Sequence, residues 1–106
     1  MALEEHLGEF SLVVDESLDP PTVVPTGELD LEAGDAFREV LFDLIDRGHE
    51  DLQVDLGGLS FMDSTGLNTL VLVRRRLEGS LVLVDPPPAV LRMLEATSLI
   101  DYFAVR

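Results

Sequence analysis

The sequence predicts an α/β domain with a mixed sheet of four to five strands covered by three to four helices. Short apolar runs alternate along the chain with longer segments whose apolar residues recur at helical spacing. Their order is strand, strand, helix, strand, helix, strand, helix, which is typical of a sheet with parallel members and helical cover. The length of 106 residues suits one domain, and 46% hydrophobic residues suffice for a core.

Each predicted element has a local signal. The predicted strands are residues 10–14, 22–26, 51–56 and 81–84, and the predicted helices are residues 30–48, 64–77 and 89–96. Pro25 requires an edge, a bulge or a strand end, because proline donates no hydrogen bond to a ladder. Asp30 can cap the first helix and Gly48 can stop it. Residues 57–63 are predicted to be a loop, and residues 99–105 remain unassigned.

The sequence predicts a domain boundary near the N-terminus. Residues 1–8 are predicted to be a loose tail, and residues 9–106 to form the domain. The acidic start lacks the positive charge of a secretory signal, and no apolar stretch reaches the length of a membrane span. We therefore expect a cytoplasmic protein without a membrane partner.

The charge balance is strongly acidic, with 7 Lys and Arg residues against 21 Asp and Glu residues and a net charge of -14. Nucleic-acid binding draws most of its affinity from cations on phosphates, so no direct nucleic-acid partner is expected. A basic patch on a partner protein is the natural complement, although net charge also serves solubility alone.

Several kinds of catalytic site are excluded or disfavoured. The chain has no cysteine, and all its cations are arginine, which excludes thiolate and lysine chemistry. His6 and His49 are the only histidines and form no metal-ligand array, so no metal or cofactor is expected. A small serine hydrolase using Ser64 and His49 stays open as an alternative. It is disfavoured because Met62 stands where a nucleophile elbow needs glycine.

One tetrapeptide stands apart, Asp63-Ser64-Thr65-Gly66, where the predicted loop enters the second helix. One interpretation is an ordinary helix cap made by Asp63 or Ser64. Another is a phosphorylated serine, because backbone N–H groups and the dipole at a helix N-terminus favour added negative charge.

A wider pattern surrounds this motif. It comprises Gly27-Glu28-Leu29-Asp30, then Val54-Asp55-Leu56, then Leu59-Ser60-Phe61-Met62-Asp63-Ser64-Thr65-Gly66-Leu67. Over residues 10–103 the chain resembles the STAS domain family, and within it the bacterial anti-sigma factor antagonists. The resemblance implies a STAS-like single domain. Two departures concern the C-terminal part: Thr97-Ser98-Leu99 replaces the Thr-Gly-Leu of the family, and the connection from Arg76 to Leu81 is short.

The resemblance also implies a function. The unphosphorylated protein would bind an anti-sigma factor with ATP-dependent serine kinase activity and so release a sigma factor. Phosphorylation of Ser64 would end binding, and a PP2C-type phosphatase would restore it. The partner-binding residues implied by the motif are Asp30, Asp63, Ser64, Thr65 and Gly66, none of them catalytic. The alternative within the family is a STAS adaptor in a stress-signalling complex or a lipid- or anion-transport assembly.

Overall fold

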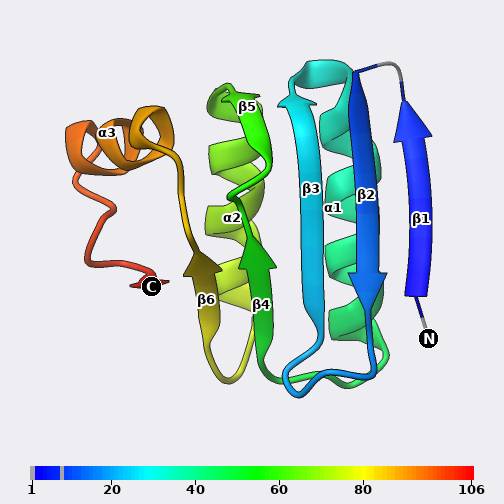
Figure 1. Ribbon diagram of the computed structural model, residues 1–106. Helices are drawn as coiled ribbons and strands as arrows, with labels where there is room; N and C mark the ends of the chain where they lie inside the picture. Colours follow the sequence, from blue (N-terminus) through cyan, green and yellow to red (C-terminus); the bar gives the residue numbers. More distant parts are fainter. Residues whose placement is uncertain (1, 8) are drawn as a thin grey trace.

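The computed structural model describes residues 2–7, for the backbone alone, and residues 9–106. In these residues the chain forms one seven-stranded sheet and three helices (Figure 1). The elements are β1 (Ala2–Leu7), β2 (Phe10–Asp15), β3 (Thr22–Leu29), α1 (Leu31–Asp46), β4 (Leu52–Asp55), β5 (Leu59–Met62), α2 (Ser64–Arg76), β6 (Leu81–Val84), α3 (Pro88–Ala96) and β7 (Ala104–Val105).

The sheet is mixed, as predicted. Its order is β1-β2-β3-β4-β6-β7, with β5 pairing to β3 beyond the end of β4. The first three strands are antiparallel, and the pairs that link β3, β4, β5, β6 and β7 are parallel. The α/β class and the three helices are therefore confirmed. The sheet has more strands than the predicted four to five, because β1, β5 and β7 are too short or too irregular in pattern to be recognised.

The core lies between one face of the sheet and the pair α1 and α2, which run side by side behind it (Figure 1). Residues of β2 alternate between buried and half-buried, so Phe10, Leu12 and Val14 point toward the helices. The apolar stripe of α1 meets them from the other side with Phe37 and Leu41, both fully buried. The apolar stripe of α1 thus faces the sheet, and α2 covers the same face beside it (Figure 1).

A break in the pairing of β3 explains the proline and the glycine of that strand. The partner of β3 changes from β4 at Val23 to β5 at Gly27, and Pro25 lies opposite the gap, as its missing N–H requires. Gly27 has φ of 89°, and a Cβ there would overlap the carbonyl oxygen of Glu9. Only glycine fits this bulge, which directs the end of β3 toward β5.

The prediction of a loop over residues 57–63 is wrong for its second half. Leu59–Met62 forms β5, whose ends are buried and whose two middle residues are exposed. This pattern has neither period of two nor a continuous apolar run, so the sequence alone did not indicate a strand.

The N-terminal segment adds an edge strand. Ala2–Leu7 pairs antiparallel with β2 along its whole length, which covers the otherwise open edge of that strand. Of the predicted tail, residues 1 and 8 lie outside the described residues. The domain boundary after residue 8 stays a prediction.

The two departures from the family pattern have clear structural consequences. In the connection to β6, Asp51 accepts hydrogen bonds from the backbone N–H and the hydroxyl of Ser80, which closes the short turn. After α3, Ser98 adopts a left-handed backbone with φ of 60°. The helix ends there through bonds from Ser98 N to Glu95 O and from Leu99 N to Leu94 O. This is a Schellman motif with serine where glycine is favoured.

Among the helices in the described residues, none has both the length and the apolar character needed to cross a membrane.

Candidate functional site

The starts of α1 and α2 lie together at one end of the sheet (Figure 1). β3 and β5 are parallel neighbours that end in register at Leu29 and Met62, and each is followed at once by an aspartate and a helix. The backbone N–H of Asp63 donates to the carbonyl of Leu29 at 3.3 Å, which ties the two strand ends together. The sheet therefore places Asp30 and Asp63 at adjacent helix starts.

Both aspartates are N-caps. Asp63 Oδ1 accepts from the backbone N–H groups of Thr65 at 2.9 Å and Gly66 at 3.4 Å. Asp30 Oδ1 accepts from Ala33 N at 3.0 Å. Both carboxylates satisfy N–H groups that would otherwise lack partners at the first helical turn. The cap interpretation of the motif is thus confirmed for Asp63 rather than for Ser64.

Ser64 is the first residue of α2, and its side chain is exposed. Among the described residues, its hydroxyl has no hydrogen-bond partner. The position combines solvent access with the positive end of a helix dipole, which stabilises negative charge. Its geometry therefore permits a phosphate without disturbing the core.

The next two residues of the motif have packing roles. Thr65 is half-buried against α1, where a Cβ on Gly34 would lie 2.9 Å from Thr65 Cγ2. Gly66 is buried, and a Cβ there would lie 2.6 Å from Met62 Cγ and close to Leu29. Gly66 thus lets α2 start directly over the strand ends, while Gly34 lets α1 approach Thr65. Sequence reasoning missed Gly34, although a glycine inside a helical stripe was the available signal.

Two exposed apolar side chains flank this end of the molecule, and sequence reasoning did not single them out. Leu31 begins α1 with 74% of its surface exposed, and Phe61 on β5 is 50% exposed. Each lies one or two residues from a capping aspartate in the sequence. Large apolar side chains that point into water beside polar groups are typical of protein-binding surfaces.

The structure separates Ser64 from His49. Ser64 begins α2 at one end of the sheet, whereas His49 follows the C-terminal end of α1 and lies 3.7 Å from Glu16. With 16 residues, α1 alone spans about 24 Å between these two ends. The side chain of His6 lies outside the described part. A Ser64–His49 pair cannot form.

The cluster around Glu16 is an ion-pair site at the far end. Arg47 contacts Glu16 at 2.6 Å and Asp43 at 3.0 Å. The hydrogen bond from Arg47 lowers the pKa of the Glu16 carboxyl, and the same bond raises the pKa of Arg47. In the described residues, no three His, Asp or Glu side chains group closely enough to hold a metal ion.

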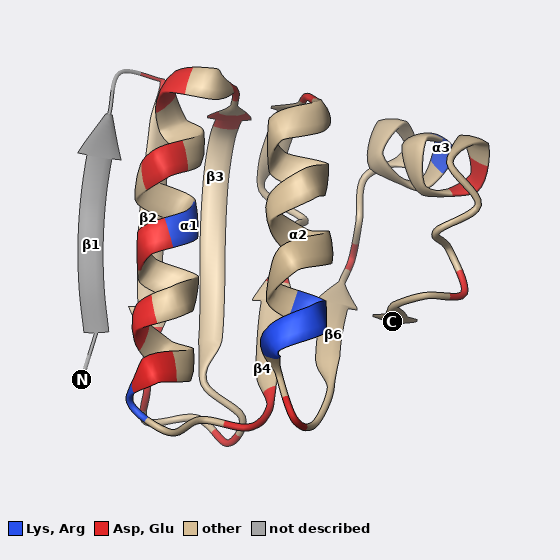
Figure 2. Ribbon diagram, turned by 180° about the vertical axis from the view of Figure 1, so that it is seen from behind, with Lys and Arg blue, Asp and Glu red and all other residues tan. Residues whose placement is uncertain are grey.

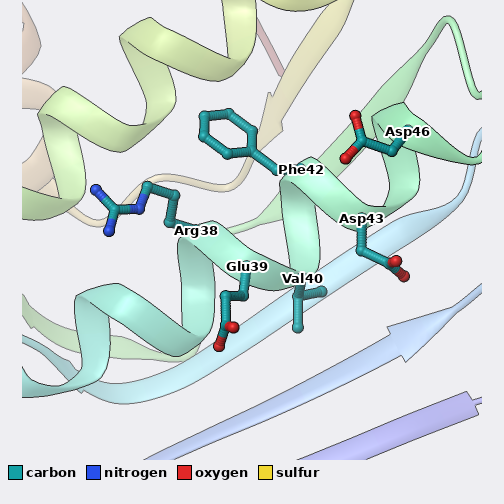
Figure 3. Close-up of a pocket in the computed structure, with 6 residues that line it drawn as sticks. All are labelled: Arg38, Glu39, Val40, Phe42, Asp43 and Asp46. Atoms are coloured by element: carbon teal, nitrogen blue, oxygen red, sulfur yellow. The ribbon is translucent and has the colours of Figure 1, made fainter.

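A hollow of about 480 Å³ is remote from the motif and follows α1 (Figure 3). One helix supplies all its lining residues, and Figure 3 shows Phe42 and Asp43 pointing to different sides of it. Asp43 forms a salt bridge with Arg47, and Asp46 forms one with Arg76. Because no set of side chains converges there, this hollow has no features of a ligand site.

Charge is distributed unevenly over the helices. Asp and Glu residues follow the outer side of α1, and three arginines gather in the last turn of α2 (Figure 2). Arg76 pairs with Asp46 and stacks on Phe42, with 4.9 Å from guanidinium carbon to ring centroid. Arg74 stacks on Tyr102 in the same way at 5.5 Å. These arginines occupy the opposite end of α2 from Ser64.

Comparison with known proteins agrees with this architecture. The STAS domain family matches residues 11–106. The anti-sigma-B factor antagonist of Bacillus subtilis is 35% identical over 78 residues, which cover 71% of each chain. The Bacillus cell fate determinant SpoIIAA is similar in its phosphorylated form, with 25% identity and a TM-score of 0.65 over 100% of this chain and 91% of that one. An anti-sigma factor antagonist from Mycobacterium paratuberculosis has 23% identity and a TM-score of 0.74 over 99% of this chain and 83% of that one. Because the match covers residues 11–106, nearly the whole of this chain, the chain belongs to the STAS domain family.

Proposed function

We propose that this chain is an anti-anti-sigma factor that is switched by phosphorylation of Ser64. In its unphosphorylated form it binds an anti-sigma factor with serine kinase activity and releases the sigma factor. The kinase transfers a phosphoryl group from ATP to the Ser64 hydroxyl, and the phosphorylated protein dissociates. A PP2C-type phosphatase removes the phosphate. The setting is the bacterial cytoplasm, and the chain itself touches neither nucleic acid nor membrane.

Two relatives support this function by their names. The Bacillus subtilis relative antagonises an anti-sigma-B factor, and the Bacillus SpoIIAA relative has a phosphorylated form. An anti-sigma factor is therefore the natural partner of this chain, and phosphorylation is the natural regulation. Both belong to a regulatory class of protein rather than to a class of enzymes.

The observation that carries the proposal is the exposed Ser64 hydroxyl at the first position of α2. A kinase reaches it without any local unfolding. The neighbouring hydroxyl of Thr65 is half-buried against Gly34, which makes it the poorer acceptor. The two capping carboxylates, Asp30 and Asp63, flank the serine and make the surface around it acidic.

Phosphorylation would change binding more than folding. A phosphate adds about -1.5 to -2 charges at pH 7, which the start of a helix tolerates. An interface fitted to a neutral hydroxyl beside Asp30 and Asp63 would then meet extra bulk and like charge. Like-charge contacts at an interface cost several kcal/mol, and about 1.4 kcal/mol already lowers affinity tenfold.

The experiment combines the purified chain with each anti-sigma factor kinase of its source organism and ATP. Mass spectrometry should find one phosphate, on Ser64. Ser64→Ala should bind the kinase without being phosphorylated, and Ser64→Asp should bind at least tenfold more weakly. Ser17→Ala, at another exposed serine that lies at the opposite end of the sheet, is the matched control and should be phosphorylated normally. Phosphate on Thr65 with Ser64 intact, or unchanged affinity after phosphorylation, would refute the proposal.

A further inference from the structure

An apolar hollow of about 140 Å³ lies between β5 and α3. Seven of its eight lining residues are apolar, and the lining comes from β5, from the N-cap of α3 and from α3 itself as far as Met93. The lining residues are Leu59, Ser60, Phe61, Met62, Pro87, Ala89, Val90 and Met93. Its size suits one or two apolar side chains rather than a cofactor.

The hollow opens beside the site at Ser64. β5 ends at Met62, which lines the hollow, and Ser64 begins α2 two residues later. Phe61 forms one wall and leaves half of its surface in water. Ala89 on the opposite wall is also exposed, so both walls are accessible from outside. A protein that covers the Ser64 hydroxyl is thus close enough to fill the hollow too.

The charges at this end are mainly negative and unpaired. Glu28 is the register partner of Phe61, and Asp30 and Asp63 follow β3 and β5. Among the described residues, the ion pairs of Glu16, Asp43 and Asp46 lie at the other end of α1, and Asp35 pairs with Arg38 in the second turn of α1. On the outer part of α3, Arg92 and Glu95 contribute one charge of each sign. An apolar hollow at an acidic end of a chain with net charge -14 is complementary to an apolar side chain flanked by cations.

We propose that this hollow receives an apolar anchor, such as Leu, Met or Phe, from a segment of the anti-sigma factor that carries Arg or Lys beside it. This inference rests on the proposed function and identifies the docking contact that accompanies recognition of Ser64. A central apolar anchor in a preformed hollow, surrounded by polar groups, is the usual form of an interface hot spot. The acidic residues around it orient the basic flank of the partner and accelerate association.

The test blocks the hollow without touching the switch. Ala89→Gln places a longer polar side chain at its mouth, and Phe61→Ala removes one wall. Ala96→Gln is the matched control, because Ala96 is exposed on the same face of α3 two turns further along and lies outside the hollow. Purified anti-sigma factors of the source organism are titrated against the wild type and each variant at two salt concentrations. Thermal melts check that all variants fold.

We expect Ala89→Gln and Phe61→Ala to bind at least tenfold more weakly, which is about 1.4 kcal/mol, while Ala96→Gln binds like the wild type. Higher salt should weaken wild-type binding. If the wild type binds and both hollow variants bind equally well, the inference fails and the proposed function stands. If no anti-sigma factor binds the wild type, the proposed function fails. If sedimentation shows that the hollow variants abolish a dimer instead, the occupant is a second copy and the inference is overturned.

Discussion

Ser98 holds the end of α3 in a backbone conformation that glycine adopts more readily. The C-terminal end of α1 has the same motif, with glycine at the corresponding position. Gly48 has φ of 101°. Its N–H donates to Ile45 O, and the N–H of His49 donates to Leu44 O. The two helix ends differ in the residue at the left-handed position. Replacing Ser98 by glycine should therefore stabilise the domain, and replacing Gly48 by serine should destabilise it.

The magnitude follows from two opposing effects. In the left-handed region a residue with a Cβ is strained by about 1–2 kcal/mol of conformational energy, and glycine removes this strain. Glycine also raises the entropy of the unfolded chain, which offsets about 0.4–1 kcal/mol. The side chain of Ser98 is exposed, so little packing is lost. Taken at the middle of both ranges, the net gain for Ser98→Gly is about 0.8 kcal/mol, which corresponds to a rise of roughly 3–6 °C in Tm.

Thermal and urea unfolding, followed by circular dichroism, measure this difference. Gly48→Ser should lower stability by a similar amount, since no atom lies within 4 Å of a Cβ there and the loss is strain alone. The reasoning is refuted if Ser98→Gly lowers Tm, or if the two reciprocal changes have the same sign.

Further predictions concern the site, the far ion pair and the surface charge. Gly66→Ala should destabilise the domain by about 1–3 kcal/mol in urea unfolding, because its methyl group would collide with Met62. Asp63→Ala should lose about 1 kcal/mol as the α2 cap disappears, whereas Asp63→Asn, which keeps an acceptor, should lose less. Arg47 lowers the pKa of Glu16, so this pair stabilises the fold above the ordinary value of 4.5 and loses that contribution as the pH falls through the folded value. Wild type should therefore lose more stability on acidification than Glu16→Gln, and equal losses would contradict the assignment. Gel-shift assays at physiological salt should detect no duplex DNA binding by a chain with net charge -14, and micromolar affinity would overturn that expectation.

Local sequence patterns were enough to predict the three helices and the cap of α1 at Asp30, and they narrowed the cap of α2 to Asp63 or Ser64. Asp30 and Asp63 precede apolar periodic segments, and cap geometry depends only on the residues of the first turn. The position of Ser64 at a helix start followed from the same signal. The resemblance to STAS domains implied a single domain of this class, whereas the strand order of the sheet came only from the structure.

The tertiary structure alone decided which motif residue is accessible and what surrounds it. Thr65 is turned against Gly34 and Gly66 is packed on Met62, so Ser64 is the residue of the three left in water. β5 exists as a strand because the bulge at Gly27 brings the end of β3 beside it. The contact of Thr65 with Gly34 and the pairing of β5 with β3 join residues about 30 positions apart, and periodicity within a short window carries no information about such contacts.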